Sequence, residues 1–138
     1  MRFCTILFFI FIACNKSDDA VEQTITQQII GTWQVNRFVI KEYGQITSDN
    51  LANDCQTQSR TTFYEDGTYT DLVYGGVVGN CESNTYEYLY SIVGGVMDIN
   101  VYENSRYISI VNDVLEVRWS ICSDECDRWN VHYYTRIN

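Results

Sequence analysis

The chain has 138 residues, of which 46% are hydrophobic and 20% are charged, and 18 Asp and Glu residues against 9 Lys and Arg residues give a formal net charge of −9. A surface of this charge repels nucleic-acid phosphates and anionic lipid head groups, which excludes nucleic-acid binding. The length fits one domain, and the hydrophobic content is sufficient for a core.

The N-terminus carries the pattern of an exported protein. Arg2 precedes an apolar run from Phe3 to Ala13. This run is shorter than the roughly 18 apolar residues that span a bilayer, so it predicts a signal peptide over residues 1–13. The pattern that ends at Ala13-Cys14 resembles a bacterial lipobox, which makes Cys14 the expected site of lipidation. The alternative is an ordinary secretory leader with a chance cysteine.

The residues after Cys14 are expected to form a lipidated tether and a short helix, over residues 14–28. The run Lys16-Ser17-Asp18-Asp19 is short, polar and charged, and it resembles export signals of some Gram-negative surface lipoproteins. We therefore expect an outer-membrane lipoprotein, exposed to the periplasm or at the cell surface. Within residues 18–30, a four-residue spacing of apolar side chains predicts one or two helical turns, which could plug or cover one end of the domain: Val21, Ile25 and Ile29.

From Gly31 onward the apolar period becomes two, which indicates strands. In the first strand Trp33, Val35 and Arg37 share a face, whereas Phe38 and Ile40 indicate a bulge or a switch of face before residue 42. The polar residues 41–59 are expected to be a long connection.

Most of the remaining chain consists of predicted hairpins. Asp66-Gly67 is a strong turn signal between strands at 61–64 and 68–74, and a glycine-rich loop is expected at 75–83. Further strands are predicted at 85–92, 97–101, 107–111, 115–121 and 128–137. Because about eight strands follow one another without long helices, we expect an all-β, antiparallel up-and-down barrel. A two-sheet sandwich is the rival architecture.

The cysteines predict two disulfides in an oxidising compartment. Cys122 and Cys126 are expected to pair across the last hairpin, which leaves Cys55 for Cys81. Zinc binding by Cys122, Cys126 and the single histidine is the weaker alternative. The cross-strand pair sets a register in which the following side chains face one another on the inner face: Trp119 and Trp129, Val117 and Val131, Leu115 and Tyr133. Glu116 and His132 then meet on the outer face.

Gly31-x-Trp33, the segment Phe63 to Tyr69, the lipobox and the strand pattern together resemble the small lipocalin-like lipoproteins of Gram-negative bacteria. The resemblance covers a domain over residues 29–138. It implies a non-enzymatic protein that binds a small, largely apolar molecule. It also implies an arginine near the end of the last strand, packed across the tryptophan of the first. Arg136 is the candidate, although the predicted register puts it on the outer face.

The aromatic content provides the candidate binding residues. We expect the ligand to be lined by Trp33, Tyr86, Tyr88, Tyr90, Trp119, Trp129 and Tyr133, unless these rings fill a closed core. No interior acid–base pair and no phosphate-binding glycine motif is recognisable, so no catalytic residue, cofactor or metal is expected. The favoured function is a membrane-anchored protein that binds a small amphipathic or apolar ligand. The alternative is a surface interaction module that binds a protein partner or a glycan.

Overall fold

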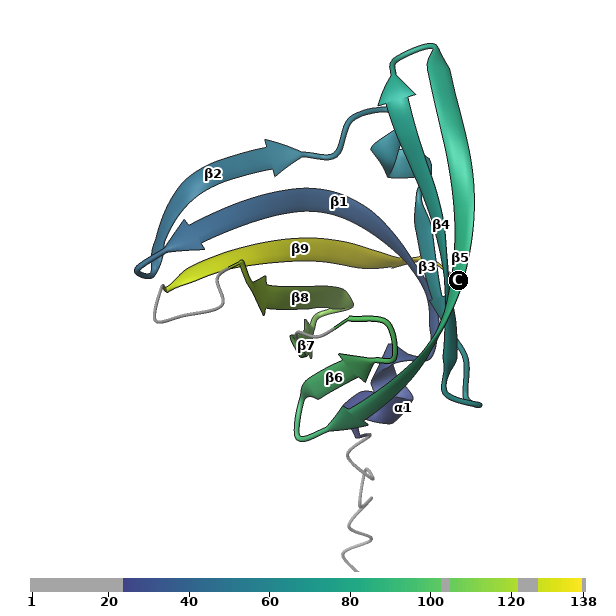
Figure 1. The fold of residues 1–138 in the computed structure, drawn as a ribbon, viewed down its shortest axis with the longest axis vertical. Coiled ribbons are helices and arrows are strands. Elements are labelled where there is room, and N and C mark those ends of the chain that lie inside the picture. The colour runs from purple at the N-terminus through teal and green to yellow at the C-terminus, as the bar shows by residue number, and fades with distance from the viewer. Residues whose placement is uncertain (1–23, 103–104, 122–126, 138) are drawn as a thin grey trace, which may run out of the picture.

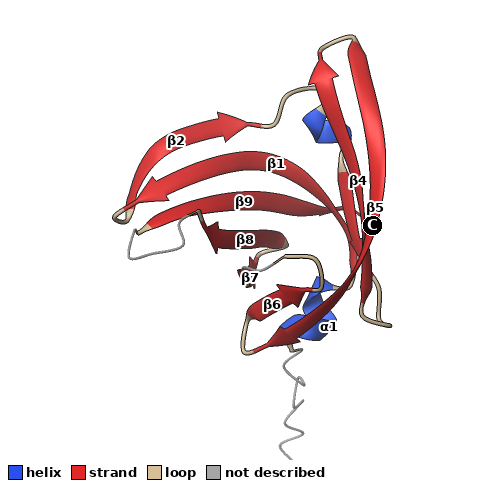
Figure 2. Cartoon of the chain, in the orientation of Figure 1, coloured by secondary structure: helices blue, strands red, loops and turns tan. Residues whose placement is uncertain are grey.

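The computed structural model describes residues 24–102, 105–121 and 127–137. One short helix, α1 (Ile25–Ile29), precedes nine strands (Figure 2). The strands are β1 (Gly31–Glu42), β2 (Gln45–Leu51), β3 (Arg60–Phe63), β4 (Thr68–Val77), β5 (Asn80–Val93), β6 (Val96–Ile99), β7 (Arg106–Val111), β8 (Val114–Ser120) and β9 (Arg128–Ile137). A 3₁₀ turn, η1 (Gln56–Gln58), lies between β2 and β3.

All nine strands belong to one antiparallel sheet, which closes because β9 also pairs with β1 (Figure 1). The closed ring contains eight strands, β1 and β3 to β9. The additional strand β2 pairs only with the second half of β1. The predicted all-β, eight-stranded barrel with a short N-terminal helix is therefore confirmed. Closure pairs both edges of every strand in the ring, at least along part of its length, whereas β2 is paired on one side alone.

β1 runs the length of the barrel and changes its partner along the way. Its first residues pair with β3, its second half pairs with β2, and the register against β9 shifts between Val35 and Arg37. The predicted bulge is thus present, and it brings Val35 and Phe38 to the same interior face while Arg37 lies on the other. The expected connection over residues 41–59 was wrong in one respect, because it contains β2. The side chains of β2 are mostly exposed, so this strand lacks the apolar alternation that reveals a half-buried strand.

The expected glycine loop at residues 75–83 is a continuation of the β4–β5 hairpin. Pairing extends to Val77 and Asn80, and the hairpin projects beyond the rest of the barrel (Figure 1). Gly76 has a φ of 104°, and a Cβ at this position would lie 2.5 Å from the carbonyl oxygen of Asn80. The glycine is therefore required by a paired backbone rather than by a loop.

The predicted register of the last hairpin was wrong by one residue. Trp119 pairs with Asn130 instead of Trp129, and Val117 pairs with His132 instead of Val131. In the same way Leu115 meets Tyr134 instead of Tyr133, and Glu116 meets Tyr133 instead of His132. A one-residue slip exchanges the faces, so His132 and Arg136 point inward. The Cys122–Cys126 pair lies outside the described residues.

The outer face explains the misassignment, because it is itself apolar where β1, β8 and β9 meet. Val39 and Val131 are direct partners with only 2% and 0% of their surfaces exposed. Arg118 lies opposite Val131 and stacks its guanidinium over Trp129, 5.7 Å from the ring centroid. Apolar residues therefore alternate on both faces of β9, and alternation alone could not identify the inner face.

The densest packing lies near α1, at one end of the barrel. Ile29 and Trp33 are fully buried there, together with side chains from five further strands: Phe63, Tyr69, Met97, Ile99, Ile108, Leu115 and Val117. Thr24 forms a capping box with Gln27 and so fixes the start of α1. No helix in the described part of the chain is long and apolar enough to cross a membrane.

Candidate functional site

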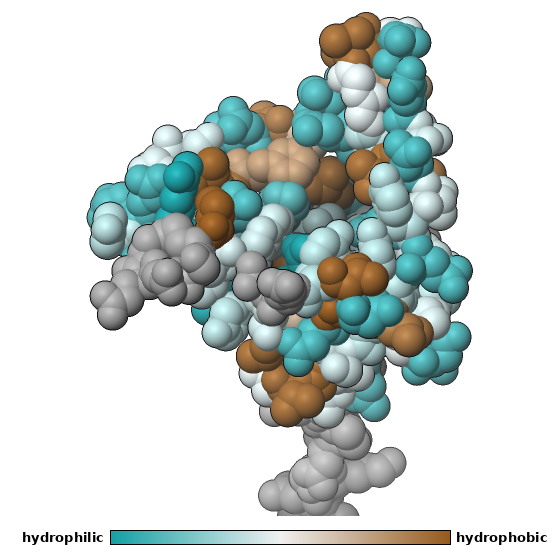
Figure 3. All heavy atoms as spheres, in the orientation of Figure 1, coloured by the Kyte–Doolittle hydropathy of each residue, from teal (hydrophilic) through white to brown (hydrophobic). Residues whose placement is uncertain are grey.

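The barrel interior is open at the end away from α1, where it encloses a cavity of about 490 Å³. In Figure 3 this face of the molecule is hollowed beside the β4–β5 hairpin, and hydrophobic side chains border the hollow. The rim includes exposed Asn53, Gly75 and Gly76. The remaining wall is formed by Val35, Phe38, Gln56, Ser59, Thr61, Asp71, Leu72, Val73, Tyr74, Arg106, Trp119, His132 and Tyr134. The volume is typical of sites for small organic molecules.

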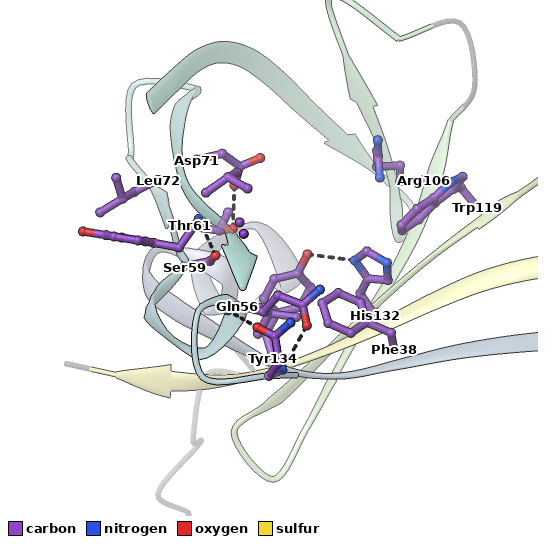
Figure 4. A pocket seen from close by; sticks show the side chains of 16 residues that line it. Phe38, Gln56, Ser59, Thr61, Asp71, Leu72, Arg106, Trp119, His132 and Tyr134 are labelled. Carbon is purple, nitrogen blue, oxygen red and sulfur yellow. Dashed lines mark hydrogen bonds between the residues drawn. The ribbon is translucent and has the colours of Figure 1, made fainter. Parts of the chain in front are cut away.

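One wall of the cavity is aromatic and comes from β1, β8 and β9 (Figure 4). The β1 bulge turns Phe38 inward, directly opposite His132 in the sheet. The His132 ring lies edge-on between Phe38 and Trp119, with 4.6 Å between centroids on each side. The hydroxyl of Tyr134 lies 3.4 Å from Nδ1 of His132. This wall offers flat apolar surface with few hydrogen-bonding groups.

The floor of the cavity is polar. Below it lies a smaller void of about 60 Å³, and four side chains border both spaces: Thr61, Asp71, Arg106 and Tyr134. The hydroxyl of Thr61 donates to Oδ1 of Asp71 at 2.6 Å. A void of this size has room for water, which would satisfy the polar groups among its lining residues.

Burial changes the protonation of the floor and of the aromatic wall. It raises the pKa of the Asp71 carboxyl, and the Thr61 hydrogen bond and the Arg106 charge oppose this shift only in part. It lowers the pKa of His132 to about 4, with a smaller contribution from the Arg106 charge. It also raises the pKa of the Tyr134 hydroxyl. At neutral pH His132 and Tyr134 are therefore uncharged, and Arg106 is a permanent positive charge of the floor.

A disulfide ties together two parts of the rim. Cys55 bonds to Cys81, and this joins the η1 segment to the β4–β5 hairpin. The predicted pairing of these two cysteines is confirmed. Gln56 and Ser59 on one side and Gly75 and Gly76 on the other line the cavity, so the bond holds the cavity wall in shape.

At the opposite end, Trp33 and Arg136 form the second polar element of the interior. The Arg136 guanidinium lies 4.3 Å from the centroid of the Trp33 ring and donates to the carbonyl oxygens of Ile30 and Gln28. The indole nitrogen of Trp33 donates to the carbonyl oxygen of Ile29 at 2.7 Å. These contacts satisfy the carbonyls at the end of α1 and fasten the helix to the barrel.

The sequence model of the lipocalin-like domain matches residues 29–118 of the chain. The chain belongs to the lipocalin-like domain family. The matched part of this lipocalin-like domain runs from the end of α1 through most of β8, so it includes Trp33, the cavity floor on β4 and β7, and the disulfide. Comparison with curated proteins gave no match.

The lipocalin-like barrel places the predicted lining residues in four environments. Trp119 lines the cavity. Tyr86, Tyr88 and Tyr90 share the interior side of β5, but Tyr86 is 45% exposed, Tyr88 and Tyr90 pack against the core, and none of them lines the cavity. Trp33 is buried beneath Arg136. Trp129 and Tyr133 lie on the outer face, as the corrected register requires.

The sequence analysis missed the polar groups of the cavity. Asp71 continues the inward positions of β4 two residues after buried Tyr69, and Arg106 precedes buried Ile108 by two on β7. A polar residue at an inward position of an alternating strand was the available signal. It indicates that the strand leaves the packed core and borders a cavity.

Proposed function

We propose that this lipocalin-like protein binds a small amphipathic ligand in the cavity and does not convert it chemically. The observation that carries the proposal is the cavity of about 490 Å³ with an aromatic wall and a polar floor. Lipocalin-like domains generally bind small hydrophobic molecules without catalysis, and the apolar walls around Phe38 and Trp119 suit such cargo. The polar floor suits a ligand with one polar end.

The side chains of the cavity support binding over catalysis. Asp71 accepts the hydrogen bond of Thr61, and His132 is held between two rings. Within the described residues no hydrogen bond joins Asp71 to His132, so they do not form an acid–base couple with each other. Both groups instead shape the polarity of the site.

Two aromatic residues provide a matched test of where the ligand binds. Trp119 lines the cavity, whereas Trp129 lies on the outer face ten residues later in the sequence. We expect Trp119→Ala to weaken binding of the fluorescent probe N-phenyl-1-naphthylamine about tenfold or more, because a large apolar contact is lost. Trp129→Ala should leave the affinity unchanged. Equal affinity of the wild-type protein and Trp119→Ala would refute the cavity as the binding site.

Native mass spectrometry is a second test, which would also identify the natural ligand. The folded protein, purified without organic solvent, should carry a mass above that of its chain, and denaturation should release this mass. The Cys55–Cys81 bond should remain in the denatured chain and lower its mass by two hydrogens, and the predicted Cys122–Cys126 bond should lower it by two more.

A surface interaction module is the second candidate, supported by the outer-face aromatic residues. Arg118 lies over the neighbouring rings of Tyr107 and Trp129, and Arg37 lies over Tyr133. Such arginine–aromatic surfaces suit a protein or glycan partner. Under this reading Trp129→Ala abolishes partner binding, while Trp119→Ala leaves it intact.

We further propose that the protein is anchored in the outer membrane through lipid on Cys14. The apolar run before Cys14 and the polar residues after it support this proposal. In a Gram-negative host, the mature protein should begin at residue 14, and its N-terminal peptide should carry acyl chains. Cys14→Ser should abolish acylation, whereas Cys4→Ser should have no effect on it. An unmodified N-terminus elsewhere in the chain would refute the anchor.

A further inference from the structure

Arg106 stands out on the cavity floor because it is a charged side chain with a buried, unused donor. Its Nε is shielded from solvent and has no hydrogen-bond partner. In the described part of the chain, no carboxylate lies within ion-pair distance of its guanidinium. An arginine cannot lose its charge at any ordinary pH, and a buried donor without an acceptor is unfavourable. The described residues therefore supply no hydrogen-bond acceptor for the Nε–H group of Arg106.

Two aromatic rings determine the direction from which an acceptor can approach. The Arg106 guanidinium lies 4.6 Å from the centroid of Tyr102 and 4.4 Å from that of Trp119. These contacts place the guanidinium over the faces of both rings and hold it in position, while its N–H groups donate hydrogen bonds in the plane of the guanidinium. A carboxylate matches this edge best, because its two oxygens can accept two parallel N–H bonds.

Asp71 is the acidic side chain of the floor, and by itself it suggests the opposite ligand, a cation. Its oxygen Oδ1 already accepts the Thr61 hydroxyl, and its burial favours the neutral acid. Figure 4 shows Asp71 and Arg106 on opposite walls of the cavity. Burial raises the pKa of the Asp71 carboxyl, which weakens the repulsion that this group exerts on an anion. The floor is consequently better suited to an anion than to a cation.

We propose that the cavity takes a carboxylate-bearing ligand head first, with the carboxylate on the edge of Arg106 and the apolar body along Phe38 and Trp119. This inference rests on the proposed function, since it names the chemical class of the cargo. It also assigns Arg106 the role of selecting acids over neutral molecules of the same shape. Tyr102 and Trp119 act as positioning residues for the guanidinium.

Three probes of one shape test the proposal by calorimetry: 2-naphthoate, the neutral 2-naphthamide and the cationic 2-naphthylmethylamine. We expect 2-naphthoate to bind wild-type protein about 10- to 100-fold more tightly than the amide. This ratio corresponds to one charge-assisted hydrogen bond to a donor that otherwise has no partner. Arg106→Gln should remove this preference. Arg118→Gln should keep it, because Arg118 also contacts two rings, Tyr107 and Trp129, but on the outer face.

The outcomes separate this inference from the proposed function. Equal affinities for the acid and the amide, with N-phenyl-1-naphthylamine still bound, overturn the carboxylate site and leave the binding cavity in place. Tighter binding of the amine overturns it in favour of Asp71. Failure to bind any of these probes refutes the cavity function and this inference together. If Arg106→Gln does not fold, the Nε–Hε resonance of Arg106 in wild-type protein decides, since it should shift on addition of 2-naphthoate and stay unchanged with 2-naphthamide.

Discussion

His132 should make the barrel sensitive to mild acid. Its ring is buried between Phe38 and Trp119, and this burial, with the Arg106 charge second, lowers its pKa from 6.5 to about 4. In the unfolded chain the ring is protonated as the pH falls below 6.5, whereas in the folded protein it stays neutral until about pH 4. Proton uptake in this window therefore favours the unfolded chain.

The size of the effect follows from the shift. Each unit of pKa difference corresponds to about 1.4 kcal/mol, so lowering the pKa from 6.5 to about 4 removes about 3 kcal/mol of stability between those pH values. Roughly half of this loss should be present at about pH 5.5. The raised pKa of Asp71 acts in the opposite direction at the acidic end of the window, because the folded protein then binds a proton more readily than the unfolded chain.

Urea unfolding at a series of pH values isolates the histidine when wild-type protein is compared with His132→Phe. The phenyl ring keeps the contacts with its aromatic neighbours but does not titrate, so the carboxylates contribute equally to both profiles. From pH 7.5 to pH 4 the free energy of unfolding of the wild-type protein should fall by about 3 kcal/mol more than that of His132→Phe. Because His132 is the only histidine, one imidazole resonance gives its pKa directly. Parallel stability profiles, or a measured pKa near 6.5, would refute the burial argument.

Two further predictions concern the plugged end and the rim. Arg136→Met should destabilise the barrel by about 2–4 kcal/mol in urea unfolding, because the carbonyls at the end of α1 lose their donors and Trp33 loses its cation. The control Arg128→Met, which breaks an exposed ion pair, should cost less than about 1 kcal/mol. Similar losses in both variants would contradict this role of Arg136. The free energy of unfolding of the double variant Cys55→Ser/Cys81→Ser should be lower by about 3.5 kcal/mol, since the bond closes a loop with a separation of 26 residues. Its affinity for N-phenyl-1-naphthylamine should also fall. An unchanged affinity would show that the rim keeps its shape without the bond.

The fold was largely predictable because most strands of this barrel are half-buried and joined by short turns. The Asp66-Gly67 hairpin and the change of face in β1 followed from local patterns. β2 was not predicted because both of its faces are mostly exposed. Its sequence therefore lacks the alternation of apolar and polar residues that indicates a half-buried strand. The hairpin at Gly76 was mistaken for a loop because its glycine is needed for close backbone approach, a reason that composition does not reveal.

The candidate site was less predictable, since it depends on which face of β9 is the inner one. Val131 is as buried on the outside as Val117 is on the inside, and a two-residue period has no preference between two apolar faces. Trp119 was correctly expected in the interior, but His132 was expected on the surface. Asp71 and Arg106 were not singled out, because each is one polar residue in a strand whose other inward residues are apolar.

The position of α1 places the N-terminal segment and the opening of the cavity at opposite ends of the barrel. Whatever precedes Thr24 in the chain joins the barrel at the plugged end, beside Trp33 and Arg136, while the mouth lies toward Phe38 and the β4–β5 hairpin. A pull on the N-terminal segment would therefore be borne by the best-packed part of the molecule. If the proposed lipid anchor and the proposed ligand are correct, the ligand enters and leaves at the opposite end from the anchor, so ligand exchange does not disturb the anchored end.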